Sequence, residues 1–218
     1  MEYLDPMKMN QQQKVWDSLA KIWKGYRTSP WKDVQRFLNY LSEQSAGRIL
    51  EIGCGNGRNL LQFAKVGFDC YGIDFSKEML RYAEEFSRKN KVNLKLKQAR
   101  AENLPFKDNY FDYVLSIAVL HHLNKEEQGK AVREMFRVLK KEGKAVVSVW
   151  NKFNPKFWRF LLKKETLVPW KVDKDIFSRY YYFFSYFELK KLLKKSGFKI
   201  IKASSAFGRN IVFEIIKG

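Results

Sequence analysis

The stretch from Arg48 to Leu60, RILEIGCGNGRNL, constrains the fold more than any other part of the sequence. An apolar run leads into three glycines at alternate positions, and a segment with helical spacing of its apolar residues follows them. This order predicts a buried strand, a tight turn and a helix, the unit from which parallel sheets are built. Glu51 stands two residues before the first glycine, which brings a carboxylate close to the turn.

Strands and helices continue to alternate along the chain. The apolar runs DCYGID and FDYVLSIAV read as buried strands, and a helical pattern follows each of them. Ser76 is placed to cap the helix after Asp74, and another strand, KAVVSVW, follows Gly143. The alternation predicts an α/β domain with a doubly wound parallel sheet.

Two segments lie outside this alternation. Residues 1–45 contain two amphipathic helical patterns, and residues 151–185 form a long aromatic and basic insertion. Insertions of this length in a compact domain usually carry specificity. Because a chain of this length can bury one substantial core, we expect a single domain over residues 1–218, with both segments as elaborations of it.

Charge narrows the class of partner. The chain has 42 Lys and Arg residues against 23 Asp and Glu residues, and the basic residues are scattered rather than gathered in a tail. A surface this basic favours a polyanion such as nucleic acid, and it also suits an anionic membrane. The sequence has no apolar run of about 18 residues and no secretory signal pattern at its start, so we expect a soluble, cytoplasmic protein.

The cysteines do not predict a metal centre. Cys54 and Cys70 are too few for a disulfide framework and lack CxxC spacing. Both are expected to be small buried side chains of the core.

The spacing of the glycines separates this turn from phosphate-binding loops. The dinucleotide pattern G-x-G-x-x-G fails because position 58 is Arg, and no Gly-Lys-Ser/Thr follows as a P-loop requires. What remains is E-x-G-x-G-x-G, with Asp74 at the end of the next strand. This arrangement resembles the cofactor loop of the class I S-adenosylmethionine-dependent methyltransferases.

The resemblance implies a fold and a cofactor. The fold is Rossmann-like, a seven-stranded, mostly parallel sheet with helices on both faces, and the cofactor is S-adenosylmethionine, a sulfonium cation without phosphate. Glu51 would attract its positive methionyl end, and Asp74 would accept hydrogen bonds from both ribose hydroxyls. In the stretch RAENLPF, many members carry Asp where this chain has Arg100. The cofactor-binding residues implied are Glu51, Gly53, Gly55, Asn56, Gly57, Asp74, Phe75, Ala101, Glu102 and Ile117.

Two classes of methyl acceptor do not fit. Superfamily members that methylate exocyclic amines of nucleobases use an Asn/Asp-Pro-Pro-aromatic turn after the fourth strand, where this chain reads SIAVLHHL. Methylation at C5 of a pyrimidine needs a nucleophilic cysteine near the acceptor, whereas Cys54 lies in the glycine turn and Cys70 in the second strand.

A narrower resemblance covers nearly the whole chain. The stretches RTSPWKDVQRFL, GCGNGRNL, SIAVLHHL, RVLKKEGKAVVSVW, VPW, SRYYYFF and GRNIVFE line up in order with the tRNA wobble-uridine carboxymethyl methyltransferases. That family esterifies 5-carboxymethyluridine at the first anticodon position of tRNA. The chain departs from it at Tyr182, where relatives often carry His, and at Ile211, where an aromatic residue is common.

Esterification of a carboxylate suits these residues. The acceptor is already ionised at neutral pH, so catalysis reduces to positioning and exclusion of water. An arginine can clamp a carboxylate with two parallel hydrogen bonds, and Arg179 is the candidate, with Tyr180 beside it. His121 or His122 would line the acceptor pocket. There are two alternatives to these site roles. The stretch SRYYYFF could simply pack the core of the insertion, and the histidines could be ordinary hydrogen-bonded loop residues.

The family resemblance also implies a partner, a small zinc-binding activator protein that extends the edge of the sheet. The alternating stretch at residues 93–99 is the candidate docking edge. Two other functions remain open: methylation of a small molecule such as a quinone precursor, and a non-catalytic basic RNA-binding scaffold. The intact Glu51, Asp74 and glycines disfavour the scaffold, and the charge favours tRNA.

Overall fold

The computed structural model describes residues 6–26, 29–41, 46–172 and 174–218. Of the predicted N-terminal helical segment, residues 1–5, 27–28 and 42–45 lie outside this description. The remainder forms two helices, α1 (Pro6–Tyr26) and α2 (Lys32–Leu41).

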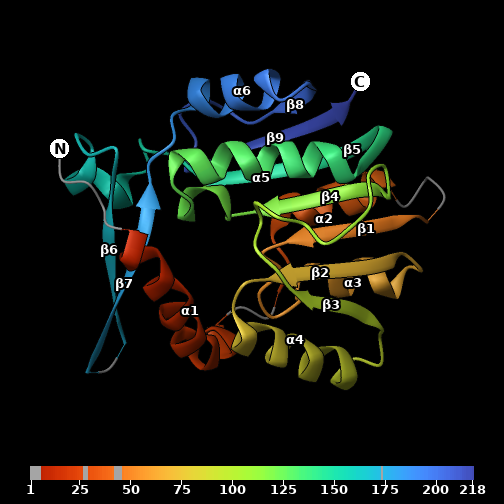
Figure 1. Cartoon of the computed structure of the whole chain (residues 1–218), viewed down its shortest axis with the longest axis horizontal. Helices are drawn as coiled ribbons and strands as arrows, with labels where there is room; N and C mark the ends of the chain where they lie inside the picture. Colours follow the sequence, from red (N-terminus) through yellow and green to blue (C-terminus); the bar gives the residue numbers. More distant parts are fainter. Residues whose placement is uncertain (1–5, 27–28, 42–45, 173) are drawn as a thin grey trace.

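A seven-stranded sheet runs through the molecule in the order β3-β2-β1-β4-β5-β9-β8 (Figure 1). Its first five members are parallel, and β9 is antiparallel to both β5 and β8. This confirms the predicted α/β fold with a mostly parallel sheet. The strands are β1 (Arg48–Ile52), β2 (Asp69–Asp74), β3 (Leu94–Gln98), β4 (Phe111–Ile117), β5 (Leu139–Trp150), β8 (Phe198–Ala203) and β9 (Asn210–Lys217).

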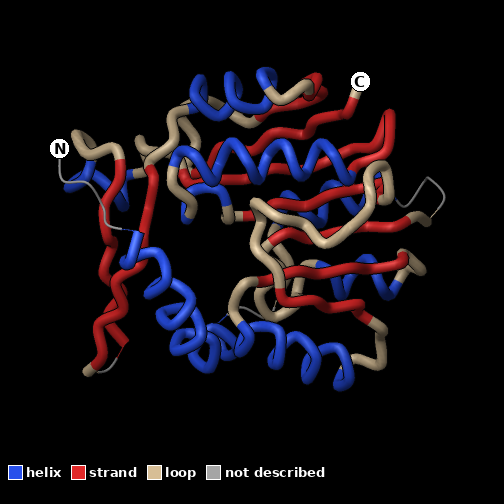
Figure 2. Tube along the Cα trace, viewed as in Figure 1, coloured by secondary structure: helices blue, strands red, loops and turns tan. Residues whose placement is uncertain are grey.

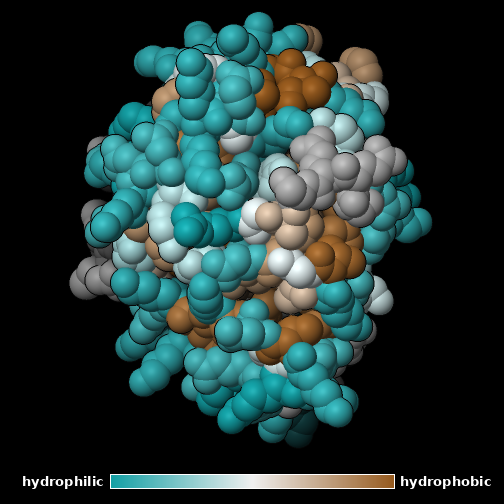
Figure 3. Space-filling model, turned by 90° about the vertical axis from the view of Figure 1, so that its right-hand side faces the viewer, coloured by the Kyte–Doolittle hydropathy of each residue, from teal (hydrophilic) through white to brown (hydrophobic). Residues whose placement is uncertain are grey.

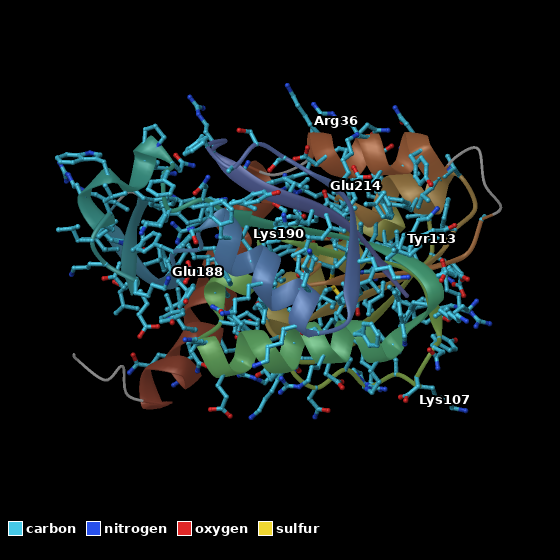
Figure 4. The ribbon with its side chains drawn as sticks, turned by 90° about the horizontal axis from the view of Figure 1, so that it is seen from above. Arg36, Lys107, Tyr113, Glu188, Lys190 and Glu214 are labelled. Atoms are coloured by element: carbon cyan, nitrogen blue, oxygen red, sulfur yellow. The ribbon has the colours of Figure 1, made fainter. Side chains whose placement is uncertain are left out.

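Helices cover both faces of the sheet. One face packs against α2, α3 (Leu60–Lys65) and α4 (Lys77–Lys89), and the other against α5 (Lys125–Val138) and α6 (Tyr186–Lys195). Figure 4 shows α2, marked by Arg36, and α5 on opposite sides of the strands. The central strands are therefore buried on both faces, as their continuous apolar sequences require.

Side-chain caps begin the helices α4, α5 and α6. Ser76 caps α4 by accepting a hydrogen bond from the Met79 amide, as the sequence predicts. Asn124 with Glu127, and Ser185 with Glu188, form capping boxes at the starts of α5 and α6. These caps help to set where each helix begins relative to the strand ends.

The insertion forms a small structure of its own, which the sequence analysis did not anticipate. A 3-10 helix, η2 (Pro155–Phe160), precedes an antiparallel hairpin of β6 (Glu165–Val172) and β7 (Asp175–Tyr182). Figure 2 shows the two strands standing apart from the main sheet, with α1 between them and the strand ends. The hairpin and α1 together cover the carboxyl edge of the parallel strands.

Figure 3 shows the side of the molecule opposite the hairpin. The part of this face that is not drawn in grey is mostly hydrophilic, with separate apolar patches. Within the described residues, no helix is long and apolar enough to cross a membrane. Cys54 and Cys70 are free and buried.

Candidate active site

A cavity of about 530 Å³ lies between the carboxyl ends of the parallel strands and the cover made by α1 and the β6–β7 hairpin. The residues after β1, β2, β3 and β4 form its floor, and a short 3-10 helix, η1 (Leu120–His122), lies at its side. Ligands of open α/β sheets bind in this position, outside the carboxyl ends of the strands.

The glycine turn gives the cavity a bare backbone wall. Gly53 and Gly55 have φ values of +66° and +53°, and both line the cavity. A Cβ atom at Gly53 would lie 2.5 Å from Cγ2 of Val119, so only glycine fits there. Gly57, also predicted as a cofactor residue, does not line the cavity, because it packs against Leu94 and Ala83.

Glu51 presents a buried carboxylate to the cavity. Its Oε1 accepts a hydrogen bond of 2.6 Å from the side-chain amide of Asn59, whereas its buried Oε2 has no hydrogen-bond partner among the described residues. Burial raises the pKa of Glu51 from 4.5 to about 8. A cation that enters the cavity would therefore stabilise the charged form of this acid.

Asp74 is the second buried acid. Its two oxygens accept hydrogen bonds of 2.9 Å from the backbone amides of Gly55 and Ser76. Burial nevertheless raises the pKa of Asp74 to about 6, since desolvation outweighs these bonds. A third acid, Asp17 of α1, accepts hydrogen bonds from the Ser76 hydroxyl and the Glu78 amide. These two bonds attach α1 to the start of α4.

The remaining predicted cofactor residues gather around these acids. Arg100 forms an ion pair with Glu102 and reaches Glu127 at 3.1 Å, so it joins the loop after β3 to the start of α5. Its charge is thus directed at two carboxylates of the protein itself. Asn56, Phe75, Ala101, Glu102 and Ile117 line the cavity, as predicted from the resemblance.

Arg179 projects from β7 into the other half of the cavity. It is 6 % exposed, and its guanidinium lies over the rings of Trp170 and Tyr181 at 4.9 and 5.1 Å. Tyr180 does not line the cavity: it faces the opposite side of β7, where its hydroxyl donates to Glu165. The sequence analysis placed Tyr180 beside the acceptor, but side chains alternate along a strand, and the cavity-lining tyrosine is Tyr181.

The two histidines line the cavity beside Arg179. The ring of His121 packs against those of Trp150 and Tyr181, with centroids 5.5 and 5.2 Å away, and its buried Nε2 has no hydrogen-bond partner in the described part of the chain. Nδ1 of His122 donates to the carbonyl of Tyr180 at 2.9 Å. Burial lowers the pKa of His122 to about 3 and that of His121 well below its usual range, so both rings are neutral.

Several cavity residues were missed by the sequence analysis. The side-chain amide of Gln12 on α1 donates a hydrogen bond to the Ser178 carbonyl and accepts one from the Tyr180 amide. It therefore holds the β7 backbone on both sides of Arg179. Many of the other missed residues come from the N-terminal helix and from the insertion, among them Trp16, Trp23, Lys156, Trp170 and Lys171. Arg58 and Asn59, which follow the glycine turn, and Trp150, at the end of β5, were missed as well. The aromatic and basic composition of the insertion was the only signal that could have pointed to some of them.

Comparison with known proteins identifies the family. The model of the Methyltransferase domain family matches residues 50–147. A protein of Encephalitozoon cuniculi named as a methyltransferase is 34% identical over 196 residues, which cover 86% of this chain and 87% of that protein. The tRNA (carboxymethyluridine(34)-5-O)-methyltransferase of Schizosaccharomyces pombe is 28% identical over 215 residues, covering 87% of this chain and 89% of the yeast enzyme.

A solved structure supports the fold. It is a complex between the Haloferax volcanii Trm112 methyltransferase activator and a methyltransferase, and the matched chain has a TM-score of 0.74 at 15% identity. The match covers 94% of this chain and 97% of that one. At this identity the likeness shows the fold alone.

The residues of the cavity fit the cofactor of this family. S-adenosylmethionine carries a positive sulfonium and an α-ammonium group, and it supplies the methyl group that is transferred. Glu51 offers a buried oxygen without a partner, Asp74 offers a second acid, and Gly53 lets a ligand approach the backbone closely. The sequence matches agree with the glycine turn, the two buried acids and the strand order of the sheet. The chain therefore belongs to the class I S-adenosylmethionine-dependent methyltransferases.

Proposed function

We propose that this methyltransferase esterifies the carboxylate of 5-carboxymethyluridine at the wobble position of tRNA. A carboxylate oxygen of the acceptor would bond to the methyl carbon as the bond from that carbon to sulfur breaks. The negative and positive charges cancel in this step, and no proton has to move. The named activity of the Schizosaccharomyces pombe relative supports this choice of acceptor.

The distribution of charge within the cavity carries the proposal. All of its described carboxylates, Glu51, Asp74 and Glu102, come from the carboxyl ends of the parallel strands and the loops after them. The cations of this half are Arg58, which donates to the Ser29 carbonyl, and Arg100, which is paired with Glu102 and Glu127. The half formed by α1, η1 and the insertion has no carboxylate among its described lining residues, and it contributes the cations Lys156, Lys171 and Arg179. A cationic donor and an anionic acceptor would each meet the opposite charge.

The histidines add a second argument. A hydroxyl or amine acceptor would need a group that removes a proton near neutral pH. His122, with a pKa lowered to about 3, is a poor base, and the buried His121 is likewise held neutral. A carboxylate acceptor needs no base, so neutral rings suffice: His121 can donate from Nε2, and His122 forms part of the wall of the pocket.

We also propose that a small zinc-binding activator docks on β3. This strand is the edge of the sheet, with Lys95, Lys97 and Gln98 exposed, so its outer backbone groups are available to an added strand. The Haloferax volcanii complex supports the partner class, since a chain of this fold is bound there to an activator. In the described residues no group of three acidic, histidine or cysteine side chains could hold a metal, so zinc would belong to the partner.

The decisive experiment supplies labelled S-adenosylmethionine to the purified protein, with and without an activator, together with tRNA carrying 5-carboxymethyluridine. Matched tRNA with unmodified uridine at the wobble position is the control. We expect label in the modified tRNA alone, released by mild base as an ester requires. Base-stable label, or label confined to small-molecule acceptors, would refute the proposal.

A further inference from the structure

An exposed aromatic and basic surface lies outside the cavity, on the insertion. It consists of residues 151–164 and the β8–β9 loop at residues 204–209, and we call it the insertion surface. Large apolar side chains stand out from it: Trp158 is 69 % exposed, Phe207 85 % and Leu162 101 %. Their exposure is costly in water and remains unexplained by the packing of this chain.

The insertion surface is held firmly in place. Phe157 is buried and packs its ring 5.0 Å from that of Trp150, so the next residue, Trp158, is turned outward. The side-chain amide of Asn151 donates to the carbonyls of Ala206 and Gly208, both at 2.8 Å. These two bonds fix the loop on either side of Phe207 against the start of the insertion.

Positive charge is interleaved with these rings. Residues 151–164, NKFNPKFWRFLLKK, contain five basic residues and no acid. Lys152 lies 5.3 Å from the centre of the Phe153 ring, and Arg159 lies 5.6 Å from that of Trp158. Flat rings flanked by cations match the two parts of a single-stranded nucleic acid, which are bases that stack and phosphates that need neutralising.

The insertion surface is continuous with the cavity. Lys156 belongs to η2 on this surface and also lines the cavity, where its ammonium lies 5.2 Å from the ring of Trp150. A nucleotide whose base enters the cavity would therefore bring its chain neighbours onto the insertion surface. Continuity with the site and charge complementarity together favour an RNA loop as the occupant.

We propose that the insertion surface binds the unpaired nucleotides beside the acceptor, with a base stacked on Trp158 and phosphates at Lys152 and Arg159. This inference rests on the proposed tRNA function and adds the residues that hold the RNA outside the cavity. An anionic membrane is the competing occupant. It is disfavoured because η2 has only six residues, too few for an amphipathic helix lying in a lipid interface.

The test compares Trp158→Ala and the conservative Trp158→Phe with the unaltered protein, using an anticodon stem-loop RNA that carries 5-carboxymethyluridine. Because Trp158→Ala removes the stacking ring, we expect its KM for this RNA to be about tenfold higher, with kcat unchanged. In Trp158→Phe, which keeps an aromatic ring, the KM should return most of the way to the value of the unaltered protein. The KM for the free nucleoside 5-carboxymethyluridine should not change. Tyr40→Ala is the matched control, because Tyr40 is another exposed ring beside a lysine, located on α2.

Direct RNA binding separates this inference from the proposed function. If no acceptor is methylated by any variant, the proposed function fails, and fluorescence anisotropy of the labelled stem-loop still tests the surface. Equal RNA affinity of Trp158→Ala and the unaltered protein would overturn the inference. If Trp158→Ala kept its RNA affinity but lost binding to phosphatidylserine vesicles, the surface would be assigned to a membrane instead.

Discussion

Replacing Glu51 by Gln removes one buried titratable group while preserving the shape of the side chain. Gln keeps an oxygen that can accept the hydrogen bond from Asn59. The substitution therefore tests a single physical quantity, the free energy of keeping an ionised carboxylate buried at this position. We expect it to stabilise the unliganded protein and to weaken cofactor binding, two effects in opposite directions.

The size of the stability effect follows from the pKa of Glu51, raised by burial from 4.5 to about 8. Above pH 4.5 the unfolded chain releases this proton, whereas the folded chain keeps it until about pH 8. The folded state therefore loses about 1.4 kcal/mol of stability per pH unit in that window, and none beyond it. Between pH 5 and 7 the advantage of Glu51→Gln should grow by about 2.5 kcal/mol, or roughly 5–10 °C in melting temperature.

Cofactor affinity should respond in the opposite sense. Binding of a cation requires the ionised carboxylate, so in the unaltered protein the affinity rises by up to about tenfold per pH unit from pH 6 to 8. Binding then releases a proton, which calorimetry detects as a dependence of the heat on the buffer. Glu51→Gln should bind about tenfold more weakly or worse and lose most of this proton release.

Thermal melts of both proteins at pH 5, 6, 7 and 8, without ligand, measure the first effect. A melting-temperature difference that stays constant across this range would refute the raised pKa of Glu51. Titration calorimetry with S-adenosylhomocysteine, which keeps the α-ammonium group, measures the second effect. Unchanged affinity in Glu51→Gln would show that this acid does not contact the cofactor.

Three further substitutions test other parts of the site. Gly53→Ala, which places a Cβ atom 2.5 Å from Val119 at a φ of +66°, should cost about 1–3 kcal/mol in chemical denaturation and abolish cofactor binding; normal binding would contradict the turn geometry. Arg179→Ala should raise the acceptor KM about 10–100-fold and leave the cofactor Kd nearly unchanged, and equal loss of both would argue against the carboxylate clamp. Gln12→Ala should lower stability by about 1–3 kcal/mol and raise the acceptor KM more than the cofactor Kd, because it frees the backbone at Tyr180. A cofactor Kd that rose in parallel would assign Gln12 a merely structural role.

Much of the fold and the cofactor half of the site is readable from the sequence. The glycine turn, Glu51 and Asp74 lie within two adjacent strand-turn-helix units, and parallel strands bring their carboxyl ends to one edge of a sheet. Local spacing alone therefore places both acids together. The same local logic predicts the cap at Ser76, because an N-cap depends only on the next three residues.

The acceptor half depends on tertiary structure. Gln12 and Tyr180 are 168 residues apart, and no local pattern relates a helix near the start of the chain to a strand of the insertion. Arg100 is another example, since its pairing with Glu127 comes from the packing of the loop after β3 against α5.

The contrast is sharpest within the stretch SRYYYFF. Its sequence indicates that tyrosines and an arginine lie beside the acceptor, but which of them face the cavity depends on how the hairpin is seated against α1 and η1. Because a strand exposes alternate side chains to opposite sides, Arg179 and Tyr181 line the cavity and Tyr180 does not. Sequence alone determined the donor chemistry through short-range spacing, whereas the long-range packing of the insertion decided which side chains line the half of the cavity proposed for the acceptor.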